Sequence, residues 1–174
     1  MALLATDGTA ITTRQIAHAA GIAEGTIFRV FPDKESLIAA AIEQAFDPAP
    51  VEAELSAIDP SLPLESRLEV AVGILQRRFI SIWRLMTAVG MTRAPVGQGQ
   101  ESNRRQITLQ ALAGVFEPDR AGLRRDPLVA AQLLRGLTFA GSHPALLVDE
   151  PLPTAEIVAL LLDGIRIAPG CPPC

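Results

Sequence analysis

A glycine between two short amphipathic segments constrains this chain more than any other feature. Thr12 and Gln15 stand at the spacing of a capping box, so a helix is predicted to begin at Thr13. Gly21 stands where the chain must leave that helix, a position that favours a positive φ angle. A second short helix is predicted over residues 24–31. Two helices joined by so short a turn form a helix-turn-helix.

The residues that follow extend this pattern into a third helix. Pro32 ends the second helix, and Asp33 can cap a helix that starts directly after it. The run resembles the tetracycline-repressor (TetR-like) family of bacterial transcription regulators. The residues that match its motif at the correct spacing are Gly25-Thr26, Phe31, Lys34-Glu35 and Leu37. The resemblance implies a DNA-binding head followed by a helical domain for ligand binding and dimerisation.

The predicted head covers residues 1–47, and the helical ligand-binding and dimerisation domain covers residues 48–174. Members of the family begin with a full helix, whereas here only residues 2–5 precede a loop, so we expect that first helix to be truncated. Residues 1–47 carry three basic side chains against six acidic ones, which leaves a net charge of −3. DNA-binding domains are usually basic, so the net charge argues mildly against binding to nucleic acid.

The resemblance and the helix positions together indicate which residues contact DNA. Arg29 is predicted to read bases, because its guanidinium fits guanine O6 and N7. Lys34 matches the family's phosphate-contacting lysine, and Thr12 and Thr13 are expected to bond phosphate. Phe28 replaces the usual tyrosine, which leaves an apolar contact with a sugar or a thymine methyl. The full predicted set is Thr12, Thr13, Glu24, Gly25, Thr26, Phe28, Arg29 and Lys34.

Some of these side chains have a second interpretation. Arg29 and Glu24 could both be solvated surface residues, and a carboxylate such as Glu24 is an unusual neighbour for phosphate. Val30 replaces a more polar residue of the family, and its spacing favours a place in the core.

The remaining periodic segments are helical, and the fold class is predicted to be all-α. Leucine, valine and isoleucine recur at spacings of three and four along residues 64–89, which predicts a long central helix. No apolar run reaches the ~18 residues that a membrane span needs. The other predicted segments are helices over 36–46, 102–116, 127–140 and 154–167, a short helix with a loop over 51–62, a loop over 90–100 and a charged connection over 117–126.

The last helix is apolar on nearly all sides, and a helix of that kind must be buried all round. A symmetric homodimer through the last two helices would bury it in a four-helix bundle, as the resemblance also implies. A fully internal helix is the alternative. The predicted dimerisation residues are Leu128, Leu134, Ile157, Val158, Leu161, Leu162 and Ile165.

A group of apolar and aromatic residues with few polar neighbours has the usual composition of a small-molecule cavity. The alternative for each residue is a solid hydrophobic core. The resemblance favours the cavity, since the family's ligands lie between these helices, and a small, mostly apolar effector is predicted. His143, Arg77 or Arg78 would bind its polar end. The predicted ligand-binding residues are Phe79, Trp83, Met86, Leu112, Phe116, Phe139 and His143.

Enzyme chemistry has little support in this sequence. The two histidines, His18 and His143, belong to no metalloprotease motif, and no hydrolase or phosphate-loop motif occurs. Cys171 and Cys174 form a C-P-P-C tail without the βαβ setting of a redox pair, so free thiols in a reducing cytoplasm are expected. We therefore expect no catalytic activity, no cofactor and no metal.

These observations together predict a cytoplasmic, homodimeric transcription regulator. It would be a repressor that leaves a palindromic operator in double-stranded DNA when a small effector binds. Two alternatives stay open. One is a regulator that keeps the head but works through a protein partner. The other is a helical small-molecule-binding protein whose acidic head no longer binds DNA.

Overall fold

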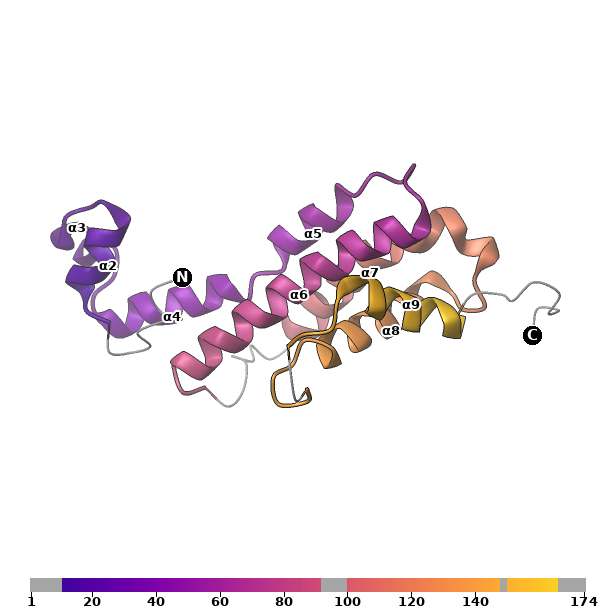
Figure 1. Cartoon of the computed structure of the whole chain (residues 1–174). Helices are drawn as coiled ribbons and strands as arrows, with labels where there is room; N and C mark the ends of the chain where they lie inside the picture. Colours follow the sequence, from indigo (N-terminus) through magenta and orange to yellow (C-terminus); the bar gives the residue numbers. More distant parts are fainter. Residues whose placement is uncertain (1–10, 92–99, 148–149, 166–174) are drawn as a thin grey trace. The chain divides into compact units, whose positions relative to one another are not determined.

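The computed structural model describes residues 11–91, 100–147 and 150–165, with the backbone alone for residues 100–105. The predicted truncation of the first helix, the last residues of the final helix and the cysteine tail lie outside these ranges, as does most of the predicted loop 90–100. Every regular element in the described ranges is helical, which confirms the all-α prediction (Figure 1). The elements are α2 Thr13–Ala20, α3 Glu24–Phe28, α4 Lys34–Ala45, α5 Ala49–Ser56, α6 Leu64–Ala88, α7 Gln100–Phe116, the 3₁₀-helix η2 Glu117–Gly122, α8 Pro127–Ala140 and α9 Thr154–Ile165.

The chain divides into two compact units. The first consists of Met1–Asp47 and Ser81–Val96, and the second of Pro48–Ile80 and Gly97–Cys174. The predicted division after residue 47 coincides with one of these boundaries. Residues 81–96, however, belong with the head rather than with the helical domain. Helix α6 thus contributes residues to both units.

The first unit has a small core of its own. Ile11, Ile38 and Leu85 are buried against one another, and Ile42 and Val89 pack beside them. Leu85 and Val89 come from the end of α6 and the residue that follows it, which explains why this part of the chain groups with the head. Among the described helices, none combines the length and the hydropathy that crossing a membrane requires.

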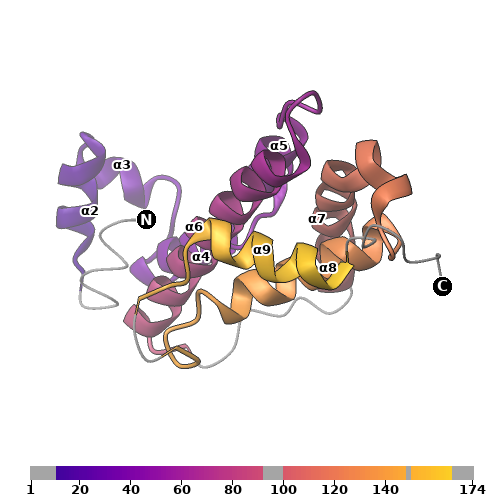
Figure 2. The same ribbon diagram turned by 45° about the vertical axis from the view of Figure 1, so that its right-hand side comes forward.

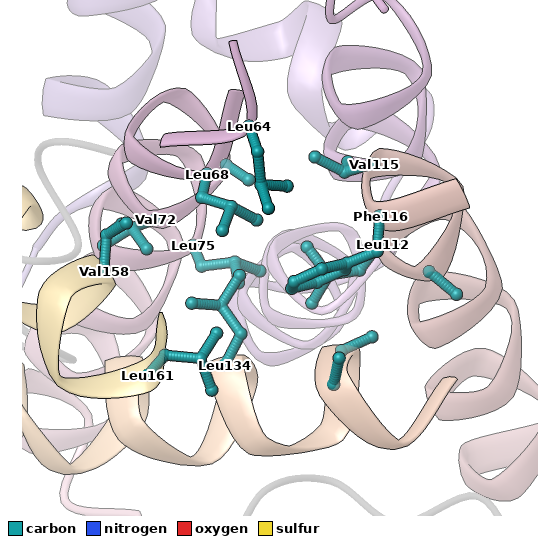
Figure 3. Close-up of a cluster of buried hydrophobic side chains, with 14 of the residues drawn as sticks. Leu64, Leu68, Val72, Leu75, Leu112, Val115, Phe116, Leu134, Val158 and Leu161 are labelled. Atoms are coloured by element: carbon teal, nitrogen blue, oxygen red, sulfur yellow. The ribbon is translucent and has the colours of Figure 1, made fainter. Parts of the chain in front are cut away.

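The second unit is built around a larger hydrophobic core that draws on α5 to α9. Leu68 and Leu75 of α6, Leu112 and Phe116 of α7 and Leu134 of α8 are all almost fully buried. Figure 3 shows these side chains pointing toward one another, with Val158 and Leu161 of α9 closing one side. The stripe predicted along residues 64–75 therefore does face a core.

A buried arginine joins three segments of the second unit. Arg67 is only 3% exposed, yet its guanidinium donates to the carbonyl oxygens of Pro60, Leu62 and Val115 at 3.1, 2.6 and 3.1 Å. It also pairs with the carboxylate of Asp119 in η2. A buried charge is tolerable only when it is hydrogen-bonded and paired, and Arg67 satisfies both conditions. The sequence analysis did not identify this residue.

Several helix boundaries differ from the sequence prediction, among them the end of α3 and the start of α5. Helix α3 ends at Phe28 rather than at Phe31, and residues 29–30 form a turn. Helix α5 begins at Ala49, inside a proline-containing stretch that was expected to lie between helices. Pro50 occupies the first turn of α5, where its missing N–H costs no intrahelical hydrogen bond.

Candidate functional site

The first two described helices are held together as the sequence predicted. The Thr12 hydroxyl accepts from the Gln15 amide at 3.2 Å, and the Gln15 side chain accepts from the Thr12 amide at 2.8 Å, which completes the capping box of α2. Gly21 ends that helix with a φ of 67°, in the left-handed region where glycine is least strained. Ala17 and Ile27 are the buried residues of α2 and α3. The buried residues of these two short helices are therefore one small side chain, Ala17, and one branched side chain, Ile27.

This packing leaves the predicted DNA-contacting residues accessible. Thr13 and Lys34 are partly exposed, and the other members of the set are exposed. They come from the start of α2, from α3 and the residue after it, and from the first residue of α4. The structure thus brings them together within the first unit, on elements that share its small core.

Thr13 and Glu24 are joined directly. The Thr13 hydroxyl of α2 donates to Oε1 of Glu24, the first residue of α3, over 2.5 Å. Thr13 was predicted to use this hydroxyl on a phosphate, but here its proton is committed to a carboxylate. The contact links the two helices at their exposed ends.

Val30 does not occupy the core position that its spacing suggested. Its side chain is 70% exposed, because α3 ends two residues earlier and Val30 lies in the turn that follows. Phe28 is also exposed, at 50%. The recognition region therefore presents two apolar side chains to its surroundings.

Two exposed side chains of α2 were not among the predicted DNA contacts. Thr12, Arg14, Gln15, His18 and Ala19 line an open surface hollow of about 430 Å³. Arg14 and His18 are four residues apart on one helix face, and both are exposed. The i, i+4 spacing of the two residues was the available signal, and they add a cation and an imidazole ring to the accessible surface of the first unit.

The third helix begins with a side-chain cap, as predicted. Asp33 accepts from the amide of Ser36 at 2.7 Å. Hydrogen bonds from the Ser36 side chain and backbone lower the pKa of the Asp33 carboxyl from its ordinary value of 3.8. The cap fixes the start of α4, where Lys34 is the first residue.

Part of the predicted ligand-binding set forms a cluster in the second unit. The rings of Phe79 and Phe139 meet edge to face, with centroids 5.4 Å apart, and the rings of Phe139 and His143 lie 5.1 Å apart. His143 Nδ1 accepts from the Ala145 amide at 3.2 Å. Phe139 is 46% exposed, and the cluster therefore reaches the surface.

The other predicted ligand-binding residues lie elsewhere. Leu112 and Phe116 are fully buried in the core of the second unit (Figure 3), where they pack against other apolar side chains. This burial fits the solid-core alternative, and a role of the two residues in ligand binding stays a prediction. Trp83 and Met86 are partly buried and belong to the first unit. Arg77, a candidate for the polar end of a ligand, is exposed and pairs with Glu54 at 2.8 Å.

Most residues of the predicted dimerisation set lie in the core of the second unit. Helix α9 is not buried all round, because Glu156, Leu160 and Asp163 are exposed on one side. Leu128 is 40% exposed, but the other predicted residues are buried within their own subunit, with their side chains committed to its core. Those buried residues are Leu134, Ile157, Val158, Leu161, Leu162 and Ile165.

Helices α8 and α9 nevertheless have an exposed apolar face. They pack against each other, and Figure 2 shows them side by side. The large side chains that they expose are distinct from those in the buried set. The residues of this exposed face are Leu128, Val129, Leu133, Leu137 and Phe139 of α8 and Leu160 of α9.

Comparison with known proteins identifies the N-terminal region. Residues 1–41 match the family model described as bacterial regulatory proteins, tetR family. The chain carries a TetR-family N-terminal domain. The resemblance on which the sequence analysis relied is confirmed, and the domain and fold are those of a DNA-binding transcriptional regulator. A comparison with curated proteins finds no match.

Solved structures extend the TetR-like fold over the whole chain. A putative TetR-family transcriptional regulator from Vibrio parahaemolyticus is 16% identical, with a TM-score of 0.58 over 96% of this chain and 94% of that one. A transcriptional regulator from Rhodococcus sp. Rha1 is 20% identical, with a TM-score of 0.59 over 97% and 94%. The SmeT–triclosan complex is 18% identical, with a TM-score of 0.52 over 98% and 91%.

Proposed function

We propose that this protein is a transcriptional repressor of the bacterial cytoplasm that binds a palindromic operator as a homodimer and leaves it when a small, mostly apolar ligand binds. The observation that carries the proposal is the TetR-family N-terminal domain, whose α2 and α3 bury Ala17 and Ile27 and leave the predicted DNA-contacting side chains accessible. An exposed second helix of a helix-turn-helix is the element that enters the major groove.

Each accessible side chain has a role that fits DNA chemistry. Arg29 would donate to guanine O6 and N7 through its planar guanidinium. Arg14 and Lys34 would bind phosphates, and Phe28 and Val30 would contact thymine methyls. A Cβ at Gly25 would meet no atom within 4 Å, so the fold itself does not require glycine there. The missing side chain would instead let the backbone of α3 approach the duplex closely.

The partner proposed for the exposed α8–α9 face is a second copy of the chain. Six large apolar side chains are exposed on two adjacent helices, and two such pairs would form a four-helix bundle. A two-fold dimer would present its heads to half-sites one or more helical turns apart, roughly 34 Å per turn. This arrangement matches a palindromic operator.

The region proposed to bind the effector is the cluster of Phe79, Phe139 and His143. Two aromatic rings would contact an apolar ligand, and the imidazole of His143 would bind its polar end. A structure of similar fold is a complex with triclosan, which supports a small-molecule effector for this chain too.

A mobility-shift experiment on the DNA upstream of the gene tests the proposal. We expect a complex that competitor DNA of random sequence does not displace, and that Arg29→Ala weakens by ~1–3 kcal/mol. Apolar candidate ligands should then release the unmutated protein, and Phe139→Ala should reduce that release without changing affinity for DNA. Binding that no ligand releases would favour a regulator that acts through a protein partner.

One observation favours a second function. The described head, residues 11–47, carries three basic side chains against five acidic ones, a net charge of −2 that opposes binding to phosphate. If the protein binds candidate ligands but gives no shift on any duplex, it is a helical small-molecule-binding protein with an inactive head.

A further inference from the structure

Glu24 is a carboxylate at the place where a base-reading side chain is expected. It is the first residue of α3, it is exposed, and its Oε1 accepts the Thr13 hydroxyl at 2.5 Å. An ionised carboxylate can only accept hydrogen bonds, and phosphates repel it. Unless such a group accepts a hydrogen bond from the DNA, it makes the free energy of binding less favourable.

The major groove offers few donors to a carboxylate. They are the N4 amino group of cytosine and the N6 amino group of adenine. Adenine also presents the N7 acceptor beside its amino group, and that lone pair repels a carboxylate, whereas cytosine has no acceptor at the neighbouring position. The chemistry of Glu24 therefore selects cytosine.

The contact with Thr13 gives this carboxylate a fixed direction. Thr13 is the first residue of α2, and the capping box between Thr12 and Gln15 fixes the start of that helix. Because the hydroxyl binds Oε1, it restricts the rotation of the Glu24 side chain and leaves Oε2 available to a base. An ordered acceptor loses less side-chain entropy on binding than a solvated one.

We infer that Glu24 specifies cytosine in each half-site of the operator, and that Thr13 is the residue that positions it. This inference rests on the proposed DNA-binding function and deepens it. Arg29 and Glu24 then read opposite features of the groove, since Arg29 requires acceptors and Glu24 requires a donor. The acidic side chain is thereby a determinant of specificity in a head of unfavourable net charge.

The test is selection of binding sites from a pool of random duplexes by the full chain and its variants. The unmutated protein should enrich cytosine at one position of each half-site. Glu24→Gln should lower the preference for cytosine over adenine there by roughly 5- to 150-fold, because glutamine both donates and accepts and pairs with adenine N6 and N7. Glu35→Gln, which removes the same charge from an exposed position on α4, should leave base preference unchanged.

The role of Thr13 is tested with two variants of similar size. Thr13→Val removes the hydroxyl and should weaken the preference for cytosine at that position, whereas Thr13→Ser keeps the hydroxyl and should retain it. A merely structural role would instead lower affinity for all sequences alike. A Thr13→Val protein with unchanged base preference would overturn the positioning role.

The outcomes separate this inference from the function on which it rests. If the unmutated protein enriches no sequence, the proposed DNA-binding function fails, and this inference fails with it. If the unmutated protein enriches a palindrome and Glu24→Gln enriches the same one with cytosine kept, the function stands and the reading by Glu24 is overturned.

Discussion

Arg67 shows how much a single buried side chain can contribute to this fold. Its guanidinium bonds three carbonyl oxygens and one carboxylate, from the segment before α6, the end of α7 and η2. We expect Arg67→Met to lower the free energy of unfolding by about 3 kcal/mol, because the carbonyl groups lose their donors in a buried setting. Urea unfolding followed by circular dichroism measures the change.

Arg77→Met is the matched control for that variant. Arg77 also pairs with a carboxylate, but both members of the Arg77–Glu54 pair are more than half exposed. Exposed pairs contribute roughly 0–1 kcal/mol, so the control should be close to the unmutated protein. If both substitutions lowered the free energy of unfolding equally, the burial of Arg67 would not explain its contribution to stability.

Asp33 makes the stability of the first unit depend on pH in the acid range. Its folded pKa lies below the ordinary value, so the ionised carboxyl stabilises the fold at pH values above the unfolded pKa. That contribution is lost as the pH falls through the folded pKa. We expect Asp33→Asn, which still caps the helix, to keep stability near neutrality and to flatten its decline below about pH 4. Thermal unfolding at a series of acid pH values measures this stability. The prediction is wrong if the stability of both proteins falls in parallel as the pH is lowered.

Gly141 is required for space rather than for backbone conformation. Its φ is −73°, but a Cβ there would come within 3.1 Å of Ile157, 3.2 Å of the Leu137 carbonyl oxygen and 3.3 Å of Leu152. We expect Gly141→Ala to destabilise the second unit by ~1–3 kcal/mol through overpacking. Gly114→Ala is the control, since its Cβ would meet nothing within 4 Å and should stabilise α7 slightly. Chemical unfolding of both variants compares them.

At the level of the elements, local sequence predicted the helices well. Capping residues such as Thr12 and Asp33 and the periodicity of α6 are properties of neighbouring residues, and they locate helices without any tertiary information. The buried face of α9 could not be derived in this way. Ile157 and Leu160 are equally apolar, and only the position of α8 and α6 decides which of them is buried.

The same limit applies to the candidate site. The residue types of the head predicted its chemistry, and the structure leaves those side chains accessible. The bond between Thr13 and Glu24 joins residues eleven positions apart on separate helices, so it depends on the angle at which α2 and α3 cross. The exposure of Val30 likewise depends on where α3 ends, a boundary that propensity locates only to within a few residues.

The exposed face of α8 and α9 yields a prediction about oligomeric state. Leu133 is 43% exposed, so Leu133→Arg should leave the subunit folded and convert a dimer to monomers. The physical reason is that a charge in a symmetric apolar interface faces its own copy without a partner. Sedimentation velocity at micromolar concentration measures the change.

Two further substitutions complete that experiment. Val70→Arg places the same charge at a similarly exposed position, 47%, on α6 and should leave the dimer intact. Leu161→Arg should unfold the second unit, because Leu161 is buried in its core. A protein that is monomeric before any substitution would show that this face does not bind a second copy.

For the whole molecule, the scarcity of cations predicts a shallow salt dependence. Residues 1–47 contain Arg14, Arg29 and Lys34 as their only basic side chains. With Arg14 and Lys34 on phosphates in both protomers, the logarithm of the binding constant should fall with the logarithm of salt with a slope of about −4. Lys34→Ala should reduce that slope to about −2. Fluorescence anisotropy over a salt series measures both, and a much steeper slope would mean that other cations contact the DNA.

The contacts of Arg67 also determine the order in which parts of the second unit can fold during synthesis. Asp119 is 52 residues further along the sequence, and a ribosome adds roughly 5–20 residues per second, so Arg67 emerges roughly 3–10 s before this partner. During that interval Arg67 can bond only the carbonyls of Pro60 and Leu62, since Val115 and Asp119 have not yet been synthesised. Helix α6 can therefore form early in synthesis, while the bonds that fix it to the end of α7 are among the later events.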